Sequence, residues 1–169
     1  MEVISSITGL HQNGVTHVDF SPDGERLVMV GNDDLHSVAV YKWRSKERLF
    51  ASSSTAHKVL DCRFIGEDTF ATCGVGHMIF WSRMGSGYAK HTGIFGKKGK
   101  PQTMLCAGAV EALVVSGTES GHLYVWEGRN CKKSVQAHHD AVNALYVVEG
   151  AEGGLVTGSR DGKVRLWNA

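Results

Sequence analysis

The sequence predicts an all-β fold, a β-propeller of about four blades that are each a four-stranded antiparallel sheet. Four tryptophans at Trp43, Trp81, Trp126 and Trp167 lie 38, 45 and 41 residues apart, and each closes a short apolar strand. Apolar or alternating segments of four to eight residues recur between turn residues. In addition, 21 glycines against two prolines favour many tight turns between short strands.

The first strand group shows the pattern that the later groups repeat. VTHVDF (15–20) and RLVMVG (26–31) flank the turn SPDG (21–24), in which proline fixes φ and the Asp-Gly pair permits a tight reversal. Two further strands follow at 37–43 and 48–54. This order predicts a four-stranded antiparallel sheet.

The other three groups repeat this plan along the chain. Their strands are expected at 59–65, 69–74, 77–82 and 87–96, at 102–108, 112–117, 122–127 and 131–136, and at 141–148, 154–159 and 163–168. Residues 1–169 are therefore expected to form a single propeller unit, with blades at approximately 11–54, 57–96, 100–136 and 138–168.

The last group stops after three strands, whereas residues 2–8 (EVISSIT) are strand-like but have no blade of their own. We expect residues 1–10 to supply an outer strand that closes the last blade of this chain or of a partner, since a closed ring leaves no raw sheet edge. A third possibility is that this strand belongs to a blade outside the chain. Four blades are few for a ring, so we expect half of a larger propeller.

The composition argues against several classes of function. A net charge of +1 gives no strong electrostatic footprint, so no nucleic-acid partner is expected. The N-terminal residues show neither a signal-peptide pattern nor a long apolar run, so we expect no membrane partner. The four cysteines lack metal-ligand spacing and are expected to be reduced thiols in a cytosolic protein.

The fourth group carries the strongest single motif, which consists of Ala137-His138, Thr157, Asp161-Gly162 and Leu166-Trp167-Asn168. It resembles a WD repeat in which Gly-His is replaced by Ala-His and Trp-Asp by Trp-Asn. The resemblance implies a buried structural tetrad of His138, Thr157, Asp161 and Trp167. A buried indole N–H needs an acceptor, and such a network is favourable only when it is complete.

The other blades keep this motif in part. The first has His11 with Asp33 or Asp34, and the third has Ser116 but a serine, Ser120, in the aspartate position. The second has only a displaced His57 beside its tryptophan. We interpret these differences as drift that preserves the fold.

A narrower resemblance covers nearly the whole chain. Its most specific parts are the Cys-Gly-x-x-His run at 73–77, ahead of a Phe-Trp strand end, and the stretch GIFGKKGKPQ at 93–102. Together with HQNGVTHVDFSPDGERL and AHHDAVNAL, they are similar to the first propeller of the echinoderm microtubule-associated protein-like family. The resemblance implies a non-catalytic cytoskeletal scaffold, located on cytoplasmic microtubules, whose tandem propellers bind α/β-tubulin. The sequence contains no coiled-coil segment, so lattice attachment by this chain alone is not expected.

A basic cluster of Lys97, Lys98 and Lys100 lies on a glycine-flanked loop and is the candidate contact for an acidic tubulin tail. Each exposed ion pair would contribute about 1 kcal/mol or less, and salt would screen it. A solvated loop is therefore the simpler interpretation.

No enzyme activity, cofactor or metal site is expected. A histidine, a hydroxyl and a carboxylate occur together in the fourth group, but their spacing relative to Trp167 is that of a buried blade network. His36, His77 and His122 recur at equivalent strand starts, which repetition explains better than zinc binding, because zinc needs three or four converging ligands.

Two further hypotheses concern partners. A generic WD-repeat adaptor for signalling or ubiquitin ligation would grip a peptide at the central pore, and only Arg160 and Arg165 favour it. The physics of sheet edges favours a homodimer, in which two four-blade halves form an eight-blade ring and each EVISSIT strand completes the partner's last blade. A self-closed four-blade monomer is the alternative.

Overall fold

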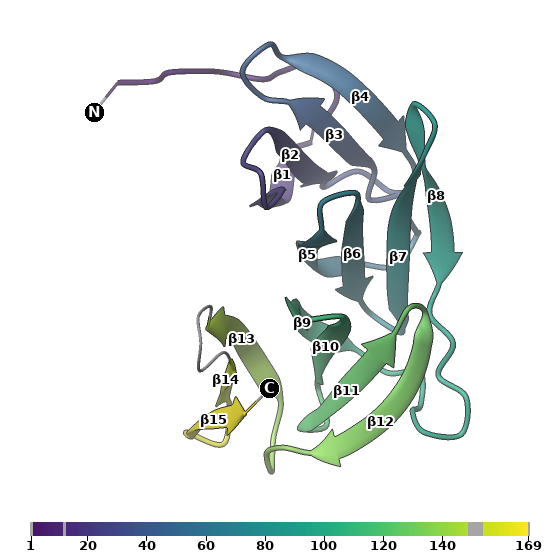
Figure 1. The fold of residues 1–169 in the computed structure, drawn as a ribbon, viewed down its shortest axis with the longest axis vertical. Coiled ribbons are helices and arrows are strands. Elements are labelled where there is room, and N and C mark those ends of the chain that lie inside the picture. Colours follow the sequence, from purple (N-terminus) through teal and green to yellow (C-terminus); the bar gives the residue numbers. More distant parts are fainter. Residues whose placement is uncertain (1, 12, 149–153, 169) are drawn as a thin grey trace.

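The computed structural model describes residues 2–11, 13–148 and 154–168. All regular secondary structure among these described residues consists of β-strands. The described strands form four antiparallel sheets that follow one another along an open arc (Figure 1). Each sheet is one blade, so the predicted all-β propeller of about four blades is confirmed. No described segment is a helix long and apolar enough to cross a membrane.

Within each blade the strands pair in chain order, from the inner side of the arc to the outer side (Figure 1). Blade 1 contains β1 Val15–Phe20, β2 Arg26–Gly31, β3 Val38–Lys42 and β4 Glu47–Ser52. Blade 2 contains β5 Val59–Gly66, β6 Thr69–Gly74, β7 His77–Met84 and β8 Gly87–Thr92. Blade 3 contains β9 Met104–Val110, β10 Leu113–Thr118, β11 His122–Glu127 and β12 Asn130–Gln136. Blade 4 contains, among the described residues, β13 Val142–Val148, β14 Gly154–Ser159 and β15 Val164–Asn168.

The turn between β1 and β2 shows how the sequence sets a hairpin. Gly24 has φ of +69°, a conformation that glycine adopts without a steric penalty. Its amide donates to the Ser21 carbonyl at 2.8 Å, and the Ser21 amide donates to the Arg26 carbonyl at 2.9 Å. The Asp23 carboxylate accepts from the Ser21 hydroxyl and from the Glu25 amide. These bonds fix the register of the two strands.

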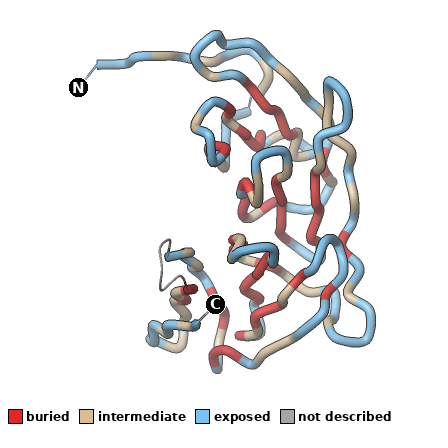
Figure 2. Tube along the Cα trace, in the orientation of Figure 1, coloured by how far each residue is buried: buried red, intermediate tan, exposed pale blue. Residues whose placement is uncertain are grey.

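The hydrophobic cores lie between neighbouring blades. Trp81 fills the core between blades 1 and 2, where Phe70 stacks on its ring at 5.5 Å, and Trp126 fills the core between blades 2 and 3. Buried residues accordingly follow the middle strands of the arc (Figure 2). Trp81 and Trp126 are fully buried, whereas Trp43 and Trp167 in the two end blades are only half-buried.

Aspartates tie the inner strands of successive blades together. Asp19 on β1 accepts from the Phe64 amide on β5 at 2.7 Å, and Asp61 on β5 accepts from the Ala107 amide on β9 at 2.9 Å. The Arg63 guanidinium lies 3.3 Å from Asp61 and 3.7 Å from Asp19. These contacts satisfy backbone amides that the packing of the blades removes from water.

Blades 1 and 2 share one further ionic link. The nearly buried Arg26 guanidinium lies 2.7 Å from Asp68 and 3.6 Å from Glu67, in the turn between β5 and β6, and 3.1 Å from Asp23. A guanidinium so far removed from water requires partners of this kind. The link therefore fixes the spacing between the two blades.

Residues 2–8 form no strand in the described structure and do not pair with β15. They lead away from blade 1 toward the open side of the arc (Figure 1). Ile7 and Leu10 pack on the free face of blade 1 around Tyr41, whereas Ile4 is 85% exposed. The described residues therefore do not form a closed four-blade ring, because the first and last blades lie at opposite ends of the arc (Figure 1).

Replacing Trp126 by alanine is expected to destabilise the chain more than replacing Trp43. Trp126 is fully buried between two blades, and truncating a core aromatic of this kind costs about 3–5 kcal/mol. Trp43 has no preceding blade against it, so its loss costs less. Urea unfolding of the parent and both variants, followed by circular dichroism, measures the difference. An equal loss of unfolding free energy in the two variants would contradict the idea that burial between two blades determines each tryptophan's contribution to stability.

Candidate functional site

The four predicted tetrad residues form one continuous hydrogen-bond chain in blade 4. The Trp167 indole donates to the Thr157 hydroxyl at 2.9 Å, and that hydroxyl lies 2.8 Å from His138 Nε2. His138 Nδ1 lies 3.1 Å from both Asp161 oxygens. Because the indole can only donate, Thr157 accepts from it and donates to Nε2, which places the imidazole proton on Nδ1, facing Asp161.

The Asp161 carboxylate ends this chain and is almost completely buried. Burial acts to raise its pKa, but hydrogen bonds from the backbone amides of His139 and Lys163, and from His138, outweigh this and hold the pKa of Asp161 at about 2. The carboxylate is therefore ionised at neutral pH and binds two backbone amides across the turn. The tetrad connects β14 and β15 with the turn between them and with the segment that joins β12 to β13.

The other blades keep only parts of the chain. Trp81 donates to Thr72 at 3.1 Å and Trp126 to Ser116 at 2.9 Å. The indole of Trp43 instead donates to the Gly24 carbonyl at 2.8 Å. The strand register explains why Trp43 has a different acceptor. In each blade, the residue two positions before the tryptophan pairs with a residue on the preceding strand. That partner is a serine or threonine in blades 2, 3 and 4 but Leu27 in blade 1.

Blade 1 also contains a partial acid and base pair. The His11 imidazole lies 3.0 Å from the Ser37 hydroxyl and 3.8 Å from Asp33, and Ser37 donates to Asp33. Of the two aspartates that the sequence left open, Asp33 is the one in contact, and Asp34 is exposed. In blade 3 the Ser120 hydroxyl binds Gln102 and His122 instead.

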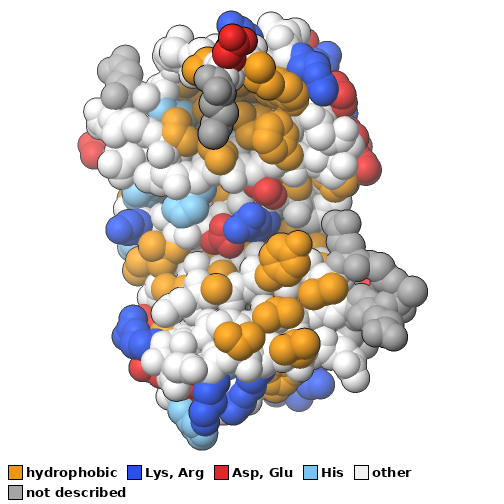
Figure 3. Space-filling view, turned by 90° about the vertical axis from the view of Figure 1, so that its left-hand side faces the viewer, with side chains coloured by type: hydrophobic (Ala, Val, Ile, Leu, Met, Phe, Trp, Pro, Cys, Tyr) orange, Lys and Arg blue, Asp and Glu red, His pale blue; other side chains and the backbone are white. Residues whose placement is uncertain are grey.

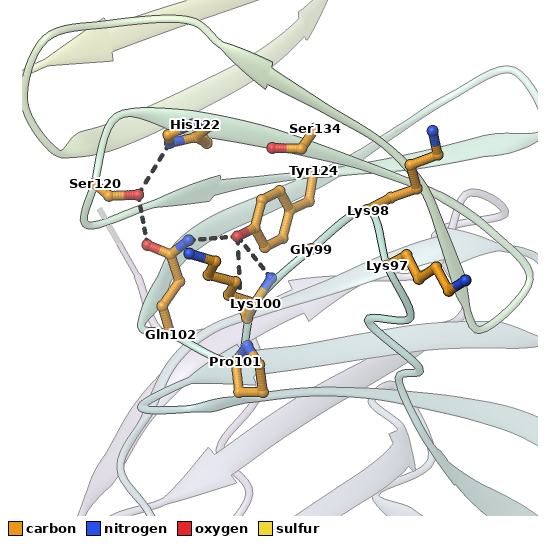
Figure 4. Close-up of a pocket in the computed structure, with 10 residues that line it drawn as sticks. All are labelled: Lys97, Lys98, Gly99, Lys100, Pro101, Gln102, Ser120, His122, Tyr124 and Ser134. Atoms are coloured by element: carbon orange, nitrogen blue, oxygen red, sulfur yellow. Dashed lines mark hydrogen bonds between the residues drawn. The ribbon is translucent and has the colours of Figure 1, made fainter.

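The candidate basic site lies in the connection between β8 and β9. Lys97, Lys98 and Lys100 are all exposed, and none forms an ion pair with a described residue. Lys97 and Lys98 extend away from the Tyr124 hydroxyl (Figure 4). The loop therefore presents three ammonium groups to solvent.

A hollow of about 450 Å³ lies beside these lysines, between the loop and blade 3 (Figure 4). Polar side chains on its wall include Gln102, Ser120, His122, Tyr124 and Ser134. The Tyr124 hydroxyl accepts from the Lys100 amide at 3.1 Å and from the Gln102 side chain, and it donates to the Lys100 carbonyl at 3.3 Å. One tyrosine thus holds both the main chain and a side chain of the loop.

The other end of the loop is fixed to blade 3 by main-chain contacts. Ile94 donates to the Arg129 carbonyl at 2.7 Å and accepts from the Cys131 amide at 2.9 Å. Phe95 packs edge-on against Trp126 with ring centroids 5.2 Å apart. Lys97, Lys98 and Lys100 therefore stand on a loop anchored at both ends, with the chemistry of a site for carboxylates.

Arg160 and Arg165 do not form a joint site. The Arg165 guanidinium donates to the Ala137 carbonyl, which holds this side chain within blade 4, whereas Arg160 is exposed.

Sequence reasoning missed the inner-strand cluster of Asp19, Asp61 and Arg63. The recurrence of an aspartate in β1 and β5, Asp19 in VTHVDF and Asp61 in VLDCRFI, is the pattern that could have indicated it.

The histidine and the hydroxyl of the tetrad are enclosed within blade 4. Among the described residues no three His, Cys, Asp or Glu side chains converge as metal ligands would. His138 and Thr157 are buried, so no substrate reaches that hydroxyl. All four cysteines are buried free thiols, and burial raises the pKa of the Cys106 thiol to about 12.

The successive blades, the tryptophan to hydroxyl bonds and the tetrad define a WD-repeat β-propeller protein. Residues 1–169 match the family model for the echinoderm microtubule-associated protein first beta-propeller. The chain belongs to the echinoderm microtubule-associated protein-like family, as its sequence motifs predicted.

Individual relatives agree with this assignment. Mouse echinoderm microtubule-associated protein-like 2 is 34% identical over 170 residues, which cover 95% of this chain and 26% of the relative. The 77 kDa echinoderm microtubule-associated protein of Lytechinus variegatus is 29% identical over 95% of this chain and 25% of its own length. The chain thus spans about a quarter of the length of these relatives.

A solved structure shares the fold. The crystal structure of the computationally designed Ika4 protein superposes with a TM-score of 0.75 and 19% identity. The match covers 99% of this chain and 98% of that one. At this level of identity the likeness concerns the fold alone.

The hydrogen bonds of Asp161 predict an acid-sensitive blade 4. The pKa of Asp161 is about 2 in the folded chain and about 3.9 when unfolded, so its contribution to stability is present above pH 4 and is lost as the pH falls toward 2. We expect Asp161→Asn to be less stable than the parent at pH 7 and to lose less stability between pH 4 and pH 2. Thermal unfolding across this range measures both effects. Asp34→Asn, which changes an exposed carboxylate, is the matched control, and parallel curves for the parent and Asp161→Asn would contradict the expectation.

Proposed function

We propose that this chain is a non-catalytic protein-interaction scaffold that binds tubulin on cytoplasmic microtubules. The observation that carries the proposal is the anchored loop with Lys97, Lys98 and Lys100 beside a polar hollow. Membership of a family whose relatives are named as microtubule-associated proteins supports tubulin as the partner. Propellers place function in loops held by a rigid body, which agrees with this location.

The proposed contact is electrostatic. Carboxylates of an acidic tubulin tail would meet the three ammonium groups, while the hydroxyls of Ser120 and Ser134 line the hollow for hydrogen bonds. Each exposed ion pair contributes about 1 kcal/mol or less, so several pairs must act together. Anchoring at Ile94 and Tyr124 reduces the conformational entropy that binding would otherwise cost.

Neutralising the basic loop tests this proposal. We expect the triple variant Lys97→Gln, Lys98→Gln, Lys100→Gln to bind tubulin roughly tenfold more weakly at low salt. The control, Lys46→Gln, Lys58→Gln, Lys132→Gln, removes the same charge from exposed lysines elsewhere. Binding of labelled chain to purified tubulin, with and without proteolytic removal of the acidic tails, measures the effect. Equal weakening in both variants, or binding that ignores the tails, would contradict the proposed contact.

The generic adaptor that binds a peptide at the central pore has less support. Arg165 is engaged with a carbonyl of its own blade, whereas Arg160 is exposed, so the two guanidinium groups do not form a cluster. The arginines on which that hypothesis depends are thus not gathered for a partner. The basic loop favours the tubulin proposal.

We also propose that the chain self-associates through its two end blades. The residue three before each tryptophan faces the following blade, and Val40, Met78 and Leu123 at this position are 0%, 0% and 4% exposed. The equivalent residue in blade 4, Val164, is 68% exposed. The free face of blade 4 therefore carries an apolar residue where the other blades bury one, and no described segment covers it.

Blade 1 offers a second apolar face at the other end of the arc. Val15, Val18 and Phe20 on β1 are each about half exposed. On the open side of the arc, hydrophobic side chains gather on both halves of the surface, with charged side chains and histidines between them (Figure 3). Two copies related by a twofold axis would cover both faces of each chain at once.

Light scattering on a sizing column tests the self-association. A chain of 18.3 kDa is expected to elute as a species of about twice that mass over a dilution series. Val164→Asp, on the free face of blade 4, is expected to shift the species to single-chain mass. A parent chain that remains at 18.3 kDa at every concentration would overturn the self-association and leave the tubulin proposal untouched.

A further inference from the structure

An apolar groove lies between blades 3 and 4, beside the outer edge of β15. It has a volume of about 210 Å³ and is lined by side chains from blades 3 and 4, among them Val125, Val135, Leu155 and Trp167. The outer edge of β15 borders it, and no described strand pairs with that edge. An edge of this kind accepts an added β-strand through its main-chain hydrogen bonds.

The complete blades show what normally fills this space. In blade 2 the outer strand β8 places Tyr88 against Phe50 of blade 1, with ring centroids 5.4 Å apart. In blade 3 the outer strand β12 places Cys131 in the core beside Trp126. Among the described residues Trp167 has no outer-strand neighbour of this kind, and it stays half-buried. The groove is thus the unfilled position of one outer-strand side chain.

Residues 2–8 have the position of an outer strand along the chain. Residues 53–58 connect β4 to β5 and residues 137–141 connect β12 to β13, and residues 9–14 separate the segment from β1 by a similar interval. Each of those outer strands precedes the inner strand of the next blade. Residues 2–8 therefore precede blade 1 by the interval that separates an outer strand from the next blade.

The contacts of the segment already match that role. Ile7 packs on the face of blade 1 that a preceding blade would cover, and the Ser5 hydroxyl donates to the Trp43 carbonyl at 3.3 Å. In an extended strand Val3, Ser5 and Ile7 share one side and Ile4 points to the other. Val3 and Ile4 are 86% and 85% exposed, and Ile4 is the one on the side opposite to Ile7, so it is free to enter a groove.

We infer that residues 2–8 of a second copy of this chain add to β15 as the fourth strand of blade 4 and place Ile4 in the groove beside Trp167. The inference rests on the proposed self-association and specifies its mechanism. In a twofold pair each chain donates its segment once and accepts its partner's once, so both raw edges are closed. Ile7 keeps its contact with its own blade 1 throughout.

A single substitution tests the strand addition. Ile4→Asp would place a carboxylate in an apolar groove, so the dimer is expected to dissociate at roughly tenfold higher concentration than the parent dimer. Met84→Asp is the matched control, because Met84 is also exposed and lies at the far end of β7. Light scattering over a dilution series reports the mass, and thermal unfolding confirms that each variant folds. A dimer equally stable in all three chains would overturn the strand addition while leaving self-association in place.

A peptide makes the test independent of how tightly the chains associate. The Ile4→Asp chain retains an intact groove, so a labelled peptide of residues 2–10 is expected to bind it, with the Ile4→Asp peptide at least about tenfold weaker. Fluorescence anisotropy measures both affinities. Equal binding of the two peptides, or binding of neither, would overturn the inference. If neither peptide binds and the parent chain is still a dimer, the interface consists of the blade faces alone.

Discussion

The need of every blade for an apolar neighbour on both faces governs this structure. A four-stranded sheet with side chains on two faces cannot bury both alone, so the cores lie between blades and each tryptophan is buried only where a neighbour covers it. The same constraint explains why Trp43 remains partly exposed, because no described blade precedes blade 1. Trp167 packs on the core between blades 3 and 4 and remains partly exposed because no described strand pairs with the outer edge of β15. The properties of the two ends therefore follow from the physics that holds the middle together.

Polar and apolar contributions are distributed unequally among the blades. Trp81 and Trp126 each keep one hydroxyl acceptor and sit in complete aromatic cores. Trp167 has an incomplete core but the complete tetrad through Thr157 and His138. In the last blade the hydrogen-bond chain fixes the strands in place of packing from an outer strand. A fully satisfied network can do this because each of its buried polar atoms has a partner.

The tryptophan period and the hydroxyl residues of the tetrad were sufficient to predict the blades, because both reflect short-range pairing between adjacent strands. The motif GIFGKKGKPQ corresponds to a loop whose backbone is anchored by blade 3. The unusual acceptor of Trp43 depends on a register that places Leu27 where other blades have a hydroxyl, and no sequence period shows this. Residues 2–8 are strand-like in composition, yet a strand needs an edge to pair with, and that edge is not next to them in the chain.

The distribution of the four cysteines has a practical consequence for measuring motion. Cys62 lies in the core between blades 1 and 2, Cys73 and Cys131 in the next core, and Cys106 in the core between blades 3 and 4. Each thiol is shielded as long as its two blades stay together. The rate at which an alkylating reagent modifies each one would therefore report how often that particular pair of blades separates, so the native chain has an internal probe at every joint between its blades.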